Sequence, residues 1–180
     1  MNKFAVSILL TFLMAANAVA AGGVADPKGT IHVGVKAGPS DVTGSPMGIG
    51  IYGGYTLFGP NTFKQNAFLS KLSFAVEGEY VNLGSTTTWG VTYRASTMGA
   101  VAAATYPIND KFSAIAKLGV ASVLSEVSGC GNWCNVSSTS IGVHAGAAGQ
   151  FNLTPQIALR AGYDNYPNHS MLSASGVFKF

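Results

Sequence analysis

The sequence predicts an all-β fold, an eight-stranded antiparallel up-and-down transmembrane β-barrel, on three observations. Charged residues make up 9% of the 180-residue chain, against roughly 25% in soluble domains, so an ordinary water-facing surface is excluded. Beyond the N-terminus there is no run of about 20 apolar residues, the length that a membrane-spanning helix needs. Instead, eight segments alternate with a period of two between an apolar face and a face of polar or very small residues, which is typical of strands that cross a membrane.

The first 20 residues have the pattern of a cleaved secretory signal peptide. Lys3 supplies the positive charge, residues 4–15 form the apolar segment, and residues 18–20 (Ala-Val-Ala) form a small-x-small cleavage site. The alternative is an uncleaved membrane anchor, for which the apolar run is short. We therefore expect a signal peptide over residues 1–20 and one barrel domain over residues 21–180.

The strands are delimited by prolines, because a proline inside a paired strand removes a ladder hydrogen bond. All seven prolines fall between the alternating segments. The expected strands, in order, are residues 30–38, 47–57, 70–83, 89–106, 112–125, 138–152, 156–163 and 171–180. The alternation is plainest in the first, third, seventh and eighth, whose apolar sets are Ile31, Val33, Val35 and Ala37; Leu72, Phe74, Val76 and Tyr80; Leu159, Ala161 and Tyr163; and Leu172, Ala174, Phe178 and Phe180.

The connectors alternate in character as well. Those after the fourth and sixth strands are compact, whereas those after the odd-numbered strands are polar and rich in Gly, Ser, Thr and Asn. An even strand number with short turns at one end and longer loops at the other favours an outer-membrane barrel over a secreted sandwich or lipocalin-like barrel. The connector 58–70 is longer than this pattern predicts. The four outer loops are residues 39–46, 84–88, 126–137 and 164–170.

Charged residues inside the strands are predicted to point into the barrel. An eight-stranded barrel is just wide enough for side chains to fill its interior, and an isolated charge there is costly, so acids and bases should pair. This predicts a lumen that is plugged by charged pairs; a narrow ion or proton path is the alternative. The expected lumen network is Lys36, Glu77, Glu79, Arg94, Lys117 and Arg160.

Cys130 and Cys134 are the only cysteines and lie three residues apart in one outer loop. An even cysteine number in an exported chain favours a disulfide. A metal site needs more ligands than two thiols. We therefore expect a disulfide that stiffens the loop around Trp133, and no metal or other cofactor.

Several motifs carry a family resemblance: residues 105–111 (TYPINDK) followed by 116–119 (AKLG), residues 76–80 (VEGEY), residues 159–163 (LRAGY), and an end on Phe180 with Phe178 two places before it. The chain resembles the small eight-stranded outer-membrane barrels of Gram-negative bacteria, namely the outer-membrane protein A-type transmembrane domain and the opacity-protein-like barrels. The resemblance implies export through the periplasm, a multi-pass location in the cell outer membrane, and both termini in the periplasm. It also implies that Phe178 and Phe180 belong to the signal that the barrel-assembly machinery reads.

The resemblance implies a structural or surface-interaction role of the opacity or adhesin kind. Outer-membrane lipid and lipopolysaccharide are the implied surroundings, and the loops could contact a host or surface ligand, with Trp89, Trp133 and Tyr166 as candidate contacts. A net charge of +3 is too small and too scattered for nucleic-acid binding. A hydrophobic-ligand channel is an alternative function.

An enzyme that modifies lipid A is a further alternative. Its chemistry needs a serine nucleophile, a base and an orienting acid within reach of one another. The local candidate is His169 and Ser170 with Asp164. Met171 follows Ser170 where the deacylase pattern has asparagine, so we expect no enzymatic activity and no catalytic residues.

Overall fold

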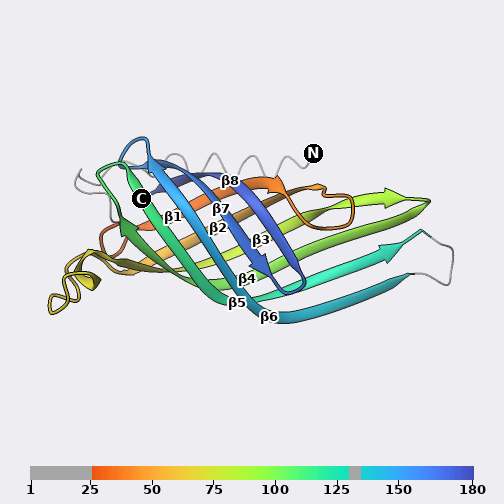
Figure 1. The fold of residues 1–180 in the computed structure, drawn as a ribbon, viewed down its shortest axis with the longest axis horizontal. Helices are drawn as coiled ribbons and strands as arrows, with labels where there is room; N and C mark the ends of the chain where they lie inside the picture. The colour runs from red at the N-terminus through yellow and green to blue at the C-terminus, as the bar shows by residue number, and fades with distance from the viewer. Residues whose placement is uncertain (1–25, 130–134) are drawn as a thin grey trace.

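The strands close into a barrel in sequence order, and every neighbouring pair is antiparallel, including β1 with β8. The computed structural model describes residues 26–129 and 135–180. In that part no helix is long and apolar enough to cross a membrane. The elements are β1 (Ile31–Pro39), β2 (Met47–Phe58), the short 3-10 helix η1 (Leu69–Lys71), β3 (Ser73–Thr88), β4 (Val91–Pro107), β5 (Phe112–Ser128), β6 (Val136–Asn152), β7 (Ile157–Tyr166) and β8 (His169–Lys179) (Figure 1).

The predicted all-β, eight-stranded up-and-down barrel is confirmed. Because β1 begins beside the end of β8, with His32 opposite Lys179, we call this end of the barrel proximal and the opposite end distal. The long proximal connector between β2 and β3 contains η1 and packs by its aromatic rings. Phe63 lies between Phe58 and Phe74, with ring centroids 5.8 and 5.9 Å away.

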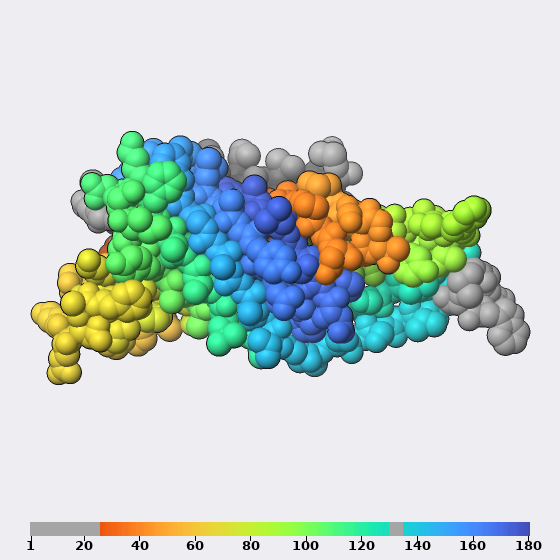
Figure 2. All heavy atoms as spheres, in the orientation of Figure 1, coloured from red at the N-terminus to blue at the C-terminus, as the bar shows by residue number. Residues whose placement is uncertain are grey.

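Four strands extend past the rest at the distal end. Strands β3 to β6 are 16 or 17 residues long, whereas the other four have 9 to 12. Pairing between β2 and β3 stops at Asn82, which lies in one row with Ser96, Leu124 and Thr139. We call the part beyond this row, residues 83–95, 125–129 and 135–138, the distal extension; it projects to the right in Figures 1 and 2.

Several strand ends therefore differ from the sequence prediction: β5 continues to Ser128, β6 begins at Val136 and β8 at His169, and the ends of β3 and β7 differ most. Residues 84–88, predicted as a loop, are strand, because Ser85 to Thr88 pair with Arg94 to Val91. Their Ser and Thr side chains lack an apolar face, so hydropathy does not reveal the strand. In the same way β7 continues to Tyr166 and leaves only Pro167 and Asn168 as its turn.

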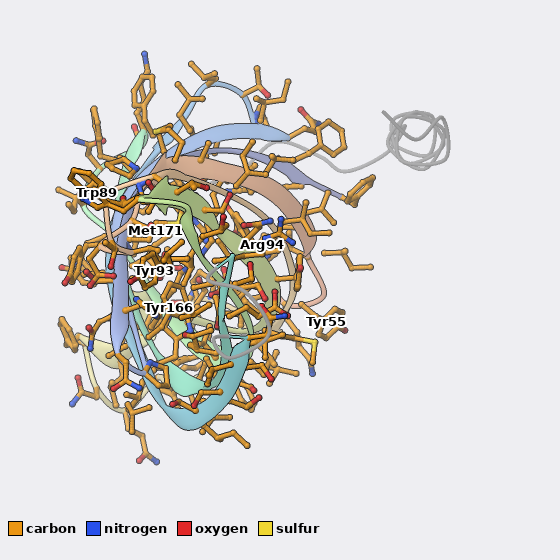
Figure 3. All side chains as sticks on the ribbon, turned by 90° about the vertical axis from the view of Figure 1, so that its right-hand side faces the viewer. Tyr55, Trp89, Tyr93, Arg94, Tyr166 and Met171 are labelled. Carbon is orange, nitrogen blue, oxygen red and sulfur yellow. The ribbon has the colours of Figure 1, made fainter. Side chains whose placement is uncertain are left out.

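The wall is apolar outside and polar inside. Outward-facing residues such as Val35, Ile51 and Leu159 are about half exposed or more, as lipid contact requires. Their neighbours along the strands, among them Lys36, Tyr52 and Arg160, are buried. The view along the axis in Figure 3 shows Tyr166 inside the ring of strands and Tyr55 on its outer surface.

Candidate functional site

A network of ion pairs crosses the barrel interior. Its proximal half centres on Glu77 of β3, which is 1% exposed. Glu77 Oε1 lies 2.9 Å from both His32 Nε2 and Arg160 Nη1, and its Oε2 lies 3.3 Å from Lys117 Nζ. Arg160 also donates to Gln150 Oε1. These residues come from β1, β3, β5, β6 and β7, so the network ties most of the wall together.

The distal half of the network centres on Lys36 of β1. Its ammonium donates to Glu79 Oε2 at 2.7 Å, to Asp164 Oδ2 at 3.1 Å and to the Tyr166 hydroxyl at 2.7 Å. All three donors of the ammonium are thereby used. Lys117 Nζ lies 3.7 Å from Asp164 Oδ1 and so links the two halves. Three carboxylates, those of Glu77, Glu79 and Asp164, face two lysines and one arginine, so the formal charges of these six groups balance.

Glycines on the inward face of the strands leave space for the side chains of the ion-pair network. A Cβ at Gly34 would lie 2.4 Å from the Tyr52 ring, and one at Gly146 would lie 2.6 Å from Asp164 Oδ1. The Tyr52 ring in turn lies 5.3 Å from Lys117 Nζ and 5.1 Å from the Arg160 guanidinium carbon, distances at which cation–π attraction operates. The glycine-rich inward face is therefore part of the network's construction.

Glu79, His144 and Asp164 could together offer one nitrogen and two oxygens to a metal ion, since their ligand atoms lie within 4.8 Å of one another. Lys36, however, already donates to both carboxylates. A divalent cation would have to displace that ammonium or share the site with it, and would add positive charge to a balanced network. The donor set therefore fits the lysine better than it fits a metal.

Five of the six residues predicted for the lumen network lie in it: Lys36, Glu77, Glu79, Lys117 and Arg160. The prediction for Arg94 is wrong. Its side chain is exposed, while its neighbour Ala95 is buried inside the barrel. Arg94 lies in the distal extension opposite Glu126 on β5, so the two outward charges can balance each other.

The prediction of Tyr166 as a loop contact is also wrong, because Tyr166 is 2% exposed and accepts from Lys36. Every second residue of β7 from Arg160 onward points into the barrel. Extending this alternation past Gly162 predicts that Asp164 and Tyr166 also point inward. Trp89 is 98% exposed at the tip of the distal extension. Trp133 and the predicted disulfide of Cys130 and Cys134 lie outside the described residues.

An apolar layer lies distal to the charged network. It consists of buried residues from β3, β4, β5, β7, β8 and the connector after β1: Val42, Val81, Leu83, Ala95, Ala121, Val123, Tyr166 and Met171. Along β5, the layer residues Ala121 and Val123 lie between Lys117 of the ion-pair network and Ser125 nearer the distal end. On its distal side lies a polar group of Asp41, Ser125, His169 and Ser170.

Asp41, in the connector after β1, gives a testable pH dependence. Partial burial raises the pKa of its carboxyl, but hydrogen bonds from Ser170 and His169 outweigh burial and hold the pKa below its ordinary value. A lowered folded-state pKa adds stability above about pH 4, the range in which the unfolded carboxyl is ionised, and this stability is lost as the pH falls through the folded-state pKa. Because Asp41 is well exposed, we expect less than about 1 kcal/mol.

The measurement is the unfolding temperature of the wild type and of Asp41→Asn between pH 7 and pH 2. The difference should be constant near neutral pH and shrink below about pH 4. A difference that is equally large at pH 2 would show that ionisation of Asp41 does not stabilise the fold.

Comparisons with known proteins agree with this architecture. The family model described as outer membrane protein beta-barrel domain matches residues 5–173. A comparison with curated protein sequences found no match. Similar solved structures include Ail, the attachment invasion locus protein of Yersinia pestis, with 18% identity, a TM-score of 0.55, and coverage of 85% of this chain and 99% of that one.

Two further structures are similar in fold. Neisserial surface protein A has 17% identity and a TM-score of 0.57 over 84% of this chain and 96% of its own. The N-terminal β-barrel domain of OprF from Pseudomonas aeruginosa has 11% identity and a TM-score of 0.59 over 86% of this chain and 100% of its own. At these identities the likeness concerns the fold alone.

Proposed function

The chain belongs to the outer membrane protein beta-barrel domain family, and on that premise we propose that it is a closed outer-membrane barrel whose distal extension binds a partner at the cell surface. The observation that carries the proposal is the distal extension itself. Strands β3 to β6 continue past the other four, and their hairpin tip presents Trp89 at 98% exposure. Tryptophan is among the residues that contribute most of the binding energy at protein interfaces.

The chemistry of the distal extension suits an uncharged partner surface. Its charged side chains in the described part are Arg94 and Glu126, which lie opposite each other and balance. The rest is uncharged, mainly Ser, Thr, Gly and Val, with Trp89 and Tyr93 as its aromatic residues. A related barrel, Ail, has been solved with the heparin analogue sucrose octasulfate; here the balanced charge favours aromatic and hydroxyl contacts over recognition of a polyanion.

The buried side chains of the barrel interior support a binding role over transport. We propose that the ion pairs around Glu77 and Lys36, together with the apolar layer distal to them, plug the lumen. Two apolar grooves of about 680 and 640 Å³ lie against outward residues such as Val33, Tyr80 and Leu159. They face the lipid, so they do not argue for a hydrophobic-ligand channel through the lumen.

Export and assembly complete the proposal. Residues 1–20 act as a signal peptide, and the proximal end faces the periplasm. Phe178 and Phe180, whose ring centroids are 4.8 Å apart at the end of β8, form the aromatic part of the signal for the barrel-assembly machinery. In this proposal outer-membrane lipid and lipopolysaccharide surround the apolar wall. The disulfide proposed from the sequence for Cys130 and Cys134, next to Trp133, concerns residues outside those that the structure describes.

Trp89→Asn tests the binding role without disturbing the fold. Trp89 and Gly90 both have positive φ, 53° and 77°, the conformation of a two-residue hairpin turn that Asn adopts more readily than Trp. We expect the variant to fold normally and to lose at least about ten-fold in adherence, as removal of an interface tryptophan worth about 1.4 kcal/mol or more predicts.

The assay compares cells that display the wild type, Trp89→Asn or Leu153→Asn for adherence to a cultured epithelial monolayer. Leu153 is equally a large exposed residue but lies in the proximal turn after β6, so its replacement should leave adherence unchanged. Equal adherence of all three at equal surface expression would refute the role of the distal extension.

A further inference from the structure

Three polar side chains meet at the distal mouth in an arrangement that their sequence positions do not suggest. Ser125 lies on the inward face of β5, His169 is the first residue of β8, and Asp41 lies in the connector after β1. Ser125 Oγ is 3.4 Å from His169 Nε2, and His169 Nδ1 is 3.2 Å from Asp41 Oδ1. One imidazole therefore links a hydroxyl on one nitrogen to a carboxylate on the other.

This is the connectivity of a nucleophile, a general base and an orienting acid. A Ser–His distance of 3.4 Å is within the looser range of an active site without substrate. Asp41 is itself held in place, since Ser170 Oγ donates to its Oδ2 at 2.9 Å and the Asp41 amide donates to the Ser170 carbonyl at 3.0 Å. The orienting acid is therefore fixed by β8, the strand that carries the base.

The sequence had offered a different set. Ser170 was the candidate nucleophile, but its hydroxyl donates to Asp41, and Asp164 is buried beneath the apolar layer with Lys36. Ser125, which lies 44 residues before His169 in the chain, is the nucleophile in this arrangement. This change of serine distinguishes the structural proposal from the sequence-based one.

We propose that Ser125, His169 and Asp41 form a hydrolase site for short-chain carboxylic esters at the distal mouth. Ser125 Oγ attacks the ester carbonyl carbon while its proton passes to His169 Nε2. The tetrahedral intermediate collapses, the bond to the alcohol oxygen breaks, and His169 returns the proton to the departing alcohol. Water then attacks the acyl-serine with His169 as base, which releases the carboxylic acid and restores Ser125.

The burial of the side chains around the site supports two parts of the proposal, namely that an ester can reach His169 and that its acyl group is short. His169 and Asp41 have side-chain exposures of 19% and 47%, so an ester can reach the imidazole from outside the barrel. The floor of the site is the apolar layer, in which Val123 and Met171, each two residues from the site on the same strand face, are almost fully buried. Because Val123 and Met171 are buried, the proposed site takes a short acyl group such as acetyl or butyryl above this apolar floor. The site does not depend on partner binding at Trp89.

The test uses the refolded full barrel in detergent micelles, with p-nitrophenyl acetate, butyrate and palmitate as substrates and a fluorophosphonate as a covalent probe. We expect hydrolysis of the acetate and butyrate but not the palmitate, and fluorophosphonate attached to Ser125 in the peptide mass spectrum. Ser125→Ala and His169→Ala should each lower kcat/KM about 100-fold or more. Asp41→Asn, which acts through His169, should lower kcat and leave KM for the acetate nearly unchanged.

Ser138→Ala is the matched control, because Ser138 lies directly opposite Ser125 on β6 and should keep full activity. Ser170→Ala should keep the fluorophosphonate on Ser125. The altered electrophoretic mobility of unheated samples verifies that each variant is folded. Hydrolysis that survives in folded Ser125→Ala, labelling at Ser170 in place of Ser125, or no labelling above the buffer blank would overturn the proposal and leave the three side chains as a purely structural tie between β1, β5 and β8.

Discussion

Replacing Glu77 by Gln should lower the free energy of unfolding by about 3–5 kcal/mol, the cost of removing one partner from a buried ionic network. Glu77 is 1% exposed and its two carboxylate oxygens face His32, Arg160 and Lys117. The amide has almost the same shape but no charge. Arg160 and Lys117 would then share a low-dielectric interior with one negative charge too few, so the loss is electrostatic and not a loss of packing.

A double variant separates the electrostatic loss from a loss of packing. Glu77→Gln with Arg160→Gln restores equal numbers of acids and bases in the network, so we expect it to be more stable than the sum of the two single losses predicts. Glu126→Gln on the outer face of the distal extension is the control and should cost less than about 1 kcal/mol. The measurement is urea unfolding in lipid vesicles followed by circular dichroism. Strict additivity, or equal losses for Glu77→Gln and Glu126→Gln, would contradict the network.

Truncating Leu83 to Ala should cost about 2–5 kcal/mol, the range for removing a large aliphatic side chain from a packed interior. Leu83 is completely buried in the apolar layer, and the Leu83 carbonyl also accepts from Ser40 Oγ at 2.6 Å. The cavity would open next to the charged network and weaken the boundary between the ion pairs and the distal mouth. Because the backbone bond to Ser40 is kept, the effect isolates side-chain packing.

Leu153→Ala is the matched control, since Leu153 lies half exposed in a proximal turn and should cost less than about 1 kcal/mol by the usual range for surface positions. Urea unfolding of both variants in the same vesicles gives the comparison. If Leu83→Ala proved no more costly than Leu153→Ala, the apolar layer would not be a packed part of the interior.

The sequence predicts the barrel well because contact with lipid requires an apolar residue at every outward position of a membrane-crossing strand. A strand such as β1 has an apolar residue at each outward position and a polar or small one at each inward position, and the period of two is strict. The pattern weakens where lipid ends. Ser85 to Thr88 are paired strand in the distal extension, but water on both faces removes the alternation that would have marked them.

The apolar outward face of a strand also determines which site residues could be predicted. Lys36 and Arg160 lie on strands whose outward faces are clearly apolar, so their inward direction follows. Strand β4 has small residues on both faces, from Gly99 to Ala104, and its parity is ambiguous; Arg94 was therefore placed inside. The meeting of Asp41, Ser125 and His169 depends on the barrel's closure and loop geometry, which no local pattern encodes.

The central claim is that ion pairs and the apolar layer close the barrel. Conductance of the refolded wild type in planar bilayers tests it most directly, with insertion verified by protease protection of the same preparation. We predict no steady open state above the bare-membrane level, because in our proposal the network around Glu77 and Lys36 and the layer around Leu83 fill the lumen in series. A steady open state of substantial size in verified, inserted protein would contradict the closed interior.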